Sequence, residues 1–139
     1  MEIMKEIDIN QPILEDESTE LSQTYLLLGK ILEEQPFLRP KLPEVLEFLQ
    51  EHKLLVAALP KIEEIIKRYL DNVTFEQFFR NDVEENYSTL VLKIFTNLDN
   101  QTSFQTQRLI FQDSSFVAII ENPAINHFLT LDFQSKYEV

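Results

Sequence analysis

The sequence predicts an α+β protein in which about three N-terminal helices precede a three-stranded antiparallel β-β-α-β module. Apolar residues recur at helical spacing up to residue 70, whereas beyond Asp71 they alternate with polar residues as in strands. The 139 residues, 44% of them hydrophobic, suffice for one domain with an ordinary core. We therefore expect an acidic leader over residues 1–17 and a single domain over 18–139, with its helical part at 18–70 and its β-β-α-β part at 73–133.

The leader is strongly acidic. Six acidic residues face one lysine, Lys5, which gives a net charge of −5; the acids are Glu2, Glu6, Asp8, Glu15, Asp16 and Glu17. Ile7 and Ile9 alternate with polar neighbours. Two interpretations stay open: a mobile tail, which is common at chain ends, or a short strand or segment that is ordered on a partner.

The first helix should begin at Ser18 or Thr19, either of which can cap free backbone amides. The Gln35-Pro36 step should end it, because the residue before a proline avoids helical geometry. One apolar seam is spaced by four, three and four residues: Leu21, Tyr25, Leu28 and Leu32.

Two further helices are expected before residue 70. Pro43 suits the first turn of the second, which should break near His52. Residues 54–59 should form one or two buried turns, and Pro60 should begin the third helix. The apolar face of that helix follows the i, i+3, i+4, i+7 rule: Ile62, Ile65, Ile66 and Tyr69. Its outer face carries two acid-first pairs at i,i+4 spacing, Glu63–Lys67 and Glu64–Arg68.

The period of two beyond Asp71 predicts strands. Two β-prone runs flank the polar stretch at 81–86 and should form an antiparallel hairpin. Asp99 or Asn100 can then cap a helix over residues 101–113, and a third strand is expected at 128–133. The core face of the sheet should carry Leu90, Leu92, Ile94, Leu129, Leu131 and Phe133.

The opposite face of this sheet is unusually apolar, since it would carry Phe78, Val91, Phe95 and Phe128. A wet sheet face is normally polar, so we expect a cover. The first helix is the expected cover, and a partner subunit or another protein is the alternative. The remaining possibility is that nothing covers this face and that its phenylalanines are simply exposed. The candidate partner interface therefore comprises these four residues together with the acidic hairpin turn, Asp82, Glu84 and Glu85.

Motifs that carry chemistry are missing from the sequence. With Gly29 as the only glycine, neither phosphate-binding loops nor a nucleophile elbow can form, and there is no cysteine to act as nucleophile or ligand. The turn acids lack the spacing and glycine of an EF-hand. His52 and His127 are best explained by structural roles at helix and strand ends. We therefore assign no catalytic, cofactor-binding or metal-binding residue and expect no cofactor.

Charge narrows the range of partners. Twelve Lys and Arg against 24 Asp and Glu give a net charge of −12, which disfavours direct nucleic-acid binding. The N-terminus has no basic stretch followed by an apolar run, and the longest apolar run, 54–59, is far too short to span a bilayer. We expect a cytoplasmic protein that binds another protein, favourably a basic one, or a second copy of itself.

Three stretches resemble a group of small, uncharacterised bacterial proteins: LPEVLEFLQ (42–50), IIKRYLDNV (65–73) and NDVEENYSTLVLKIFTNLD (81–99). The resemblance covers residues 37 to 133. It implies an N-terminal helical part followed by a compact β-β-α-β module, and it implies no reaction.

These observations favour an acidic protein-interaction module, with an antitoxin-like or regulatory role as the expected kind of function. Three alternatives stay open. The chain could form a structural or regulatory homodimer, it could mimic DNA with a row of carboxylates, or it could be an enzyme that uses carboxylate or histidine chemistry.

Overall fold

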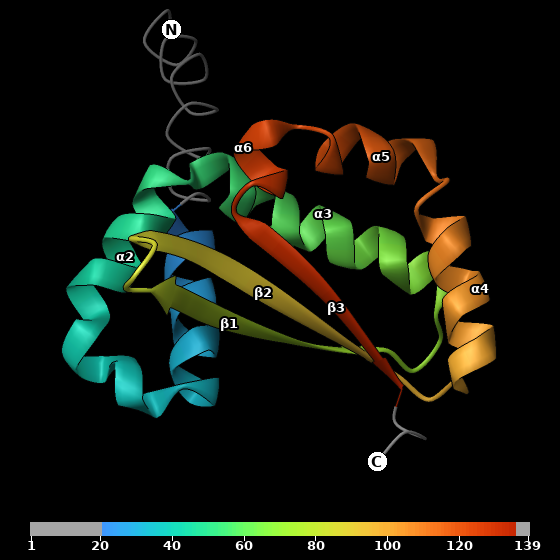
Figure 1. Ribbon diagram of the computed structural model, residues 1–139, viewed down its shortest axis with the longest axis horizontal. Helices are drawn as coiled ribbons and strands as arrows, with labels where there is room; N and C mark the ends of the chain where they lie inside the picture. Colours follow the sequence, from blue (N-terminus) through green and yellow to red (C-terminus); the bar gives the residue numbers. More distant parts are fainter. Residues whose placement is uncertain (1–20, 136–139) are drawn as a thin grey trace, which may run out of the picture.

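The structure, a computed structural model, describes residues 21–135 of the chain. The acidic leader at 1–17 and the expected caps Ser18 and Thr19 lie outside these residues. Within them the fold is α+β: helices and a three-stranded sheet pack around one core (Figure 1). No helix of the described part is long and apolar enough to cross a membrane.

The helical part follows the expected order. Residues 21–34 are helical, and the helix ends before Gln35-Pro36 as predicted. The proline-rich connector forms a 3-10 helix, η1 (Pro36–Lys41), and α2 (Leu42–Glu51) has Pro43 in its first turn and ends at His52.

The expected break at Pro60 is wrong. Helix α3 (Lys53–Tyr69) is continuous, with Pro60 inside it. A proline within a helix forfeits one backbone hydrogen bond and costs about 3 kcal/mol. Buried side chains on both sides of Pro60 offset that cost, namely Leu55, Val56, Ala58, Leu59, Ile62, Ile65 and Ile66. Of the two expected ion pairs on this helix, Glu64–Arg68 forms at 3.8 Å, whereas Glu63 instead accepts a hydrogen bond from Gln77.

The sheet is mixed rather than purely antiparallel. Strands β1 (Thr74–Asp82) and β2 (Tyr87–Thr96) form the expected hairpin, with Phe78 opposite Val91. Strand β3 (Leu129–Ser135) pairs with β2 in parallel, Leu90 opposite Leu129. A parallel neighbour requires a crossover, and the chain from β2 to β3 returns through helices to the end of the sheet where β2 began.

Three helices make this crossover, where one was expected. Asp99 caps α4 (Asn100–Ile110) by accepting from the backbone N–H of Thr102, as its position predicted. Helices α5 (Ser114–Ile120) and α6 (Pro123–Asn126) were not anticipated. Their side chains Phe116 and Ile125 are buried in the core, while Phe104 and Leu109 of α4 are exposed.

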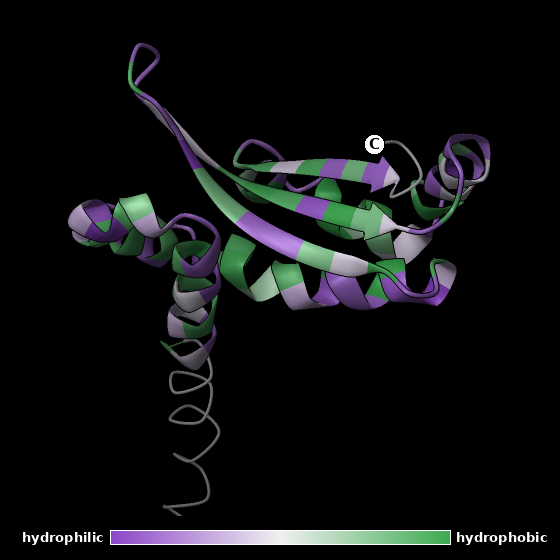
Figure 2. Ribbon diagram, turned by 90° about the horizontal axis from the view of Figure 1, so that it is seen from below, coloured by the Kyte–Doolittle hydropathy of each residue, from purple (hydrophilic) through white to green (hydrophobic). Residues whose placement is uncertain are grey.

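All the described helices lie to one side of the sheet or at its ends, and none lies across the opposite face (Figures 1 and 2). The core forms on the helix side, where Leu90, Leu92 and Ile94 of β2 meet the 21–34 helix, α2 and α3. The first helix therefore does not cover the second sheet face, contrary to expectation: its Leu27, Leu28 and Ile31 join the core instead.

The side chain of Gln35 attaches the helical part to the free edge of β1. Its Nε2 donates to the carbonyl oxygen of Phe79 at 2.9 Å, and its Oε1 accepts from the Phe79 N–H at 2.7 Å. The amide thus bonds the backbone as a neighbouring strand would, and all the atoms involved are buried.

Replacing Gln35 by Ala should destabilise the fold by about 1–3 kcal/mol, because both backbone groups of Phe79 lose their partner. Gln35→Glu keeps the acceptor but places a buried carboxylate against the carbonyl oxygen of Phe79, so it should destabilise the fold at least as much at neutral pH. Urea denaturation measures both. Equal stability of Gln35→Ala and the wild type would show that water replaces the amide without cost.

Asp113 links α3 to α5. Its Oδ2 accepts from the Tyr69 hydroxyl at 2.5 Å, and its Oδ1 accepts from the N–H groups of Ser115 and Phe116 at the start of α5. The hydrogen bond from Tyr69 and then that from Phe116 lower the pKa of Asp113 below its ordinary value. The same contact raises the pKa of Tyr69.

A lowered pKa in the folded state means that Asp113 stabilises the fold above its unfolded-state pKa, and that this contribution disappears as the pH falls through its folded-state pKa. We therefore expect Tyr69→Phe to be less stable than the wild type at neutral pH. On acidification, the free energy of unfolding should fall less in this variant than in the wild type. Denaturation midpoints measured from neutral to acidic pH check this. Parallel pH profiles for the two proteins would contradict it.

Candidate functional site: a cationic groove beside the hairpin

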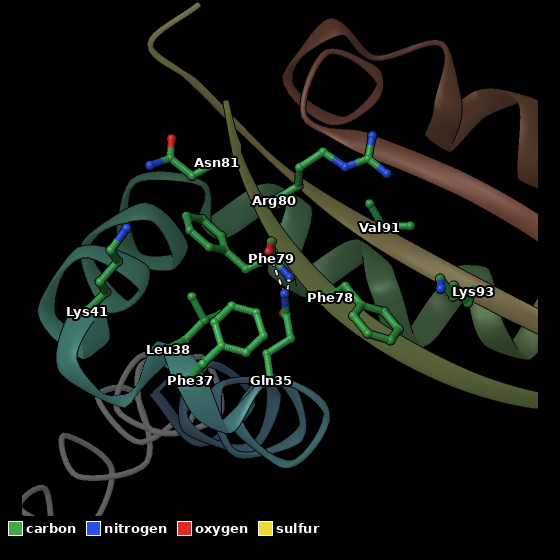
Figure 3. Close-up of a pocket in the computed structure, with 10 residues that line it drawn as sticks. All are labelled: Gln35, Phe37, Leu38, Lys41, Phe78, Phe79, Arg80, Asn81, Val91 and Lys93. Carbon is green, nitrogen blue, oxygen red and sulfur yellow. Dashed lines mark hydrogen bonds between the residues drawn. The ribbon is translucent and has the colours of Figure 1, made fainter. Parts of the chain in front are cut away.

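A hollow of about 360 Å³ lies where η1 meets the free edge of the hairpin, and it extends onto the outer sheet face (Figure 3). One wall comes from η1 and the residue before it, and the other from β1 and β2. We call it the hairpin groove, and define it by its lining: Gln35, Phe37, Leu38, Lys41, Phe78, Phe79, Arg80, Asn81, Val91 and Lys93.

Local sequence explains the helical wall. Pro36 stops the preceding helix and starts a 3-10 turn, in which Pro40 is also accommodated. This tight turn buries Leu38 and leaves Phe37 on the surface, with 72% of its side chain exposed. Burying this ring against a partner would be worth about 1.5–3 kcal/mol.

The strand wall combines apolar and cationic side chains. Phe78 and Val91 are paired across the hairpin, so they stand side by side on the outer face. Val91 is buried yet does not belong to the main core, which places it on the outer face. The ammonium nitrogen of Lys93 lies over the Phe78 ring, 4.5 Å from its centre, in a cation–π contact.

Charge in the groove is opposite to that of the whole chain. Lys41, Arg80 and Lys93 are three of the twelve basic residues, and no carboxylate appears among the lining residues. Among the described residues, none of the three forms an ion pair within 4.0 Å. Lys41 enters from the helical wall, while Arg80 and Lys93 project from the hairpin (Figure 3). The nearest acids by strand register are Glu76 and Asp132, which flank Lys93 on its neighbouring strands.

The seven residues expected to form the partner interface do not all come together. Phe78 and Val91 line the groove, and Phe95 lies further along β2, half-buried, with Thr74 and Gln134 as its register partners. Placing Phe128 on the outer face is wrong. It packs against the core, with its ring 4.2 Å from that of His52 and 6.4 Å from that of Phe48.

The acidic hairpin turn stands apart from the groove. Asp82, Glu84 and Glu85 are exposed, and the N–H of Glu85 donates to Oδ1 of Asp82, so this carboxylate supports the turn locally. Asn86 takes the left-handed backbone conformation, with φ 53°, that closes such turns. Within residues 21–135, these acids and the other His, Asp and Glu side chains form no group that could hold a metal ion.

The two histidines take structural positions. His52 lies between α2 and α3, where Nδ1 and the carbonyl oxygen of Phe48 are 2.8 Å apart and the ring stacks on Phe48. Because a carbonyl only accepts, Nδ1 must carry the proton in this contact. His127 follows α6 and is exposed.

Phe37, Lys41, Arg80 and Lys93 were missed as site residues. Part of the signal was available: alternation along the two hairpin strands places Arg80 and Lys93 on the same face as Phe78 and Val91. The basic residues are scattered along the sequence, however, and only folding brings Lys41 next to the hairpin.

Comparison of the chain with protein-family models, with curated proteins and with solved structures found no match. The resemblance to small bacterial proteins therefore stays a prediction.

The groove cations should be dispensable for folding. We define the groove variant as Lys41→Glu with Arg80→Glu; both side chains are exposed and lack an ion pair among the described residues. Its free energy of unfolding should stay within about 0.5 kcal/mol of the wild type per substitution. The matched control, Lys61→Glu with Arg108→Glu, changes the net charge equally on α3 and α4. Urea denaturation of both variants is the measurement, and cooperative unfolding well below the wild-type midpoint would contradict the expectation.

Proposed function

We propose that this protein is a protein-interaction module that binds an acidic, partly apolar segment of a partner protein in the hairpin groove. The observation that carries the proposal is the groove itself: its lining combines three basic side chains, which form no ion pair among the described residues, with exposed Phe37 and half-buried Phe78. Aromatic and arginine side chains are typical anchors of protein interfaces.

The charge that we expect on the partner segment follows from the charges lining the groove rather than from the net charge of the whole chain. At physiological ionic strength charges are screened over about 8 Å. A segment inside the groove therefore interacts chiefly with Lys41 and Arg80, because Glu76 and Asp132 flank Lys93 at neighbouring register positions, and it interacts only weakly with more distant acids. The net charge of −12 instead opposes long anionic partners, because a nucleic acid would extend beyond the groove over acidic surface.

A basic partner, favoured by the total charge, fits a different place. The exposed acids of the hairpin turn would meet it, and this remains a separate prediction. Homodimerisation through the groove is disfavoured, since a two-fold axis there would bring the three cations of one copy against those of the other.

A random peptide library displayed on phage tests the proposal. Selection on the full-length wild type should enrich peptides that combine Asp or Glu with aromatic or branched apolar residues. A selected peptide should bind the groove variant about tenfold more weakly, which is about 1.4 kcal/mol, because two of the three cations have been reversed. The control variant, Lys61→Glu with Arg108→Glu, should bind it like the wild type.

Two outcomes would overturn the proposal. Enrichment of basic peptides would place recognition on the acidic turn, and equal recovery on the wild type and the groove variant would place it outside the groove. Light scattering of the unliganded protein supplies an independent check, since a dimer that the groove variant abolishes would show that a second copy occupies this surface.

A further inference from the structure

We infer that the acidic N-terminal segment of this same chain, residues 1–17, binds in the hairpin groove and competes there with the partner. This inference rests on the proposed function, because it concerns the occupancy of the same groove. Charge complementarity supports it. The segment has six acids and Lys5, whereas the groove has three cations and no carboxylate among its lining residues.

The chemistry of the segment matches the groove beyond charge. The stretch Glu6-Ile7-Asp8-Ile9 alternates acid and branched apolar side chains. In an extended segment the carboxylates would lie on one side and the isoleucines on the other. The groove lining supplies both kinds of side chain, with exposed Lys41 and Arg80 for the carboxylates and exposed Phe37 beside half-buried Phe78 for the isoleucines.

The connection is long enough. The described helix begins at residue 21 and reaches the groove at Gln35, so its 14 residues separate the two by roughly 21 Å at 1.5 Å per residue. The twelve residues from Ile9 to Leu21 can span about 40 Å when extended. The acidic stretch can therefore return to the groove of its own molecule.

Because the N-terminal segment belongs to the same chain as the groove, weak contacts suffice to hold it there. A segment that belongs to the same chain as its binding site experiences an effective concentration in the millimolar range when the connection is short. Surface ion pairs and a few apolar contacts are individually weak, yet they can hold a tethered segment in place. A segment of another protein must then have a higher intrinsic affinity for the groove in order to displace the leader. The leader would thus exclude weak or non-specific ligands.

The absence of cysteine from the chain permits a direct test, because one introduced thiol is unique. Asn10→Cys, in the full-length ¹⁵N-labelled protein, is coupled to a nitroxide spin label. Paramagnetic broadening should then weaken the amide signals of Arg80, Val91 and Lys93. Amides of α4, at the opposite end of the sheet (Figure 1), serve as the internal reference and should keep their intensity.

Two variants make the test specific. Broadening of the groove amides should be lost in the groove variant and in Glu6→Gln with Asp8→Asn, but not in the control variant Lys61→Glu with Arg108→Glu. Glu6→Gln with Asp8→Asn should also bind a library-selected acidic peptide about tenfold more tightly than the wild type, because the competing segment is weakened.

The outcomes separate this inference from the proposed function. Unchanged groove amides in the spin-labelled chain would overturn the inference, and the proposed function would stand if a selected acidic peptide still shifts those signals. Failure of both measurements would overturn both. A mixture of spin-labelled protein at natural nitrogen abundance with ¹⁵N-labelled wild type separates the two arrangements. Broadening of the groove amides in this mixture would show contact between copies and would overturn the intramolecular arrangement.

Discussion

The two hydrogen bonds between the Gln35 amide and the backbone of Phe79 join the halves of this molecule. An edge strand offers unpaired N–H and C=O groups that can recruit another chain, and this amide occupies one such pair on β1. Its position depends on Pro36, which ends the preceding helix just after Gln35. The same contact holds η1 beside the hairpin, and therefore creates the helical wall of the groove.

The groove shows why total charge is a poor guide to local recognition. A chain with twice as many acids as bases still lines one groove with three cations, because strand alternation puts Arg80 and Lys93 on the outer face and η1 contributes Lys41 to the opposite wall. The acids of the hairpin turn are exposed at its tip. The proposed binding of an acidic segment in the groove and the separate prediction of a basic partner at the turn therefore concern two different places.

Local patterns predicted elements well where a single physical preference decided them. Caps and prolines correctly placed Asp99 before α4 and Pro43 in the first turn of α2, and alternation correctly predicted the hairpin. The failures arose where distant packing outweighed a local preference. Burial on both sides of Pro60 kept α3 continuous, and α5 and α6 formed because Phe116 and Ile125 fill the core.

The sequence alone determined that this is an α+β domain with a sheet whose second face carries Phe78 and Val91, since period and alternation are local properties of the chain. Only the tertiary structure decided what lies beside that face. The parallel placement of β3, the inward position of Phe128 and the position of η1 beside the edge of β1 each depend on contacts between residues far apart in the sequence. Such contacts are selected by the packing of the whole core, which no short stretch of sequence encodes.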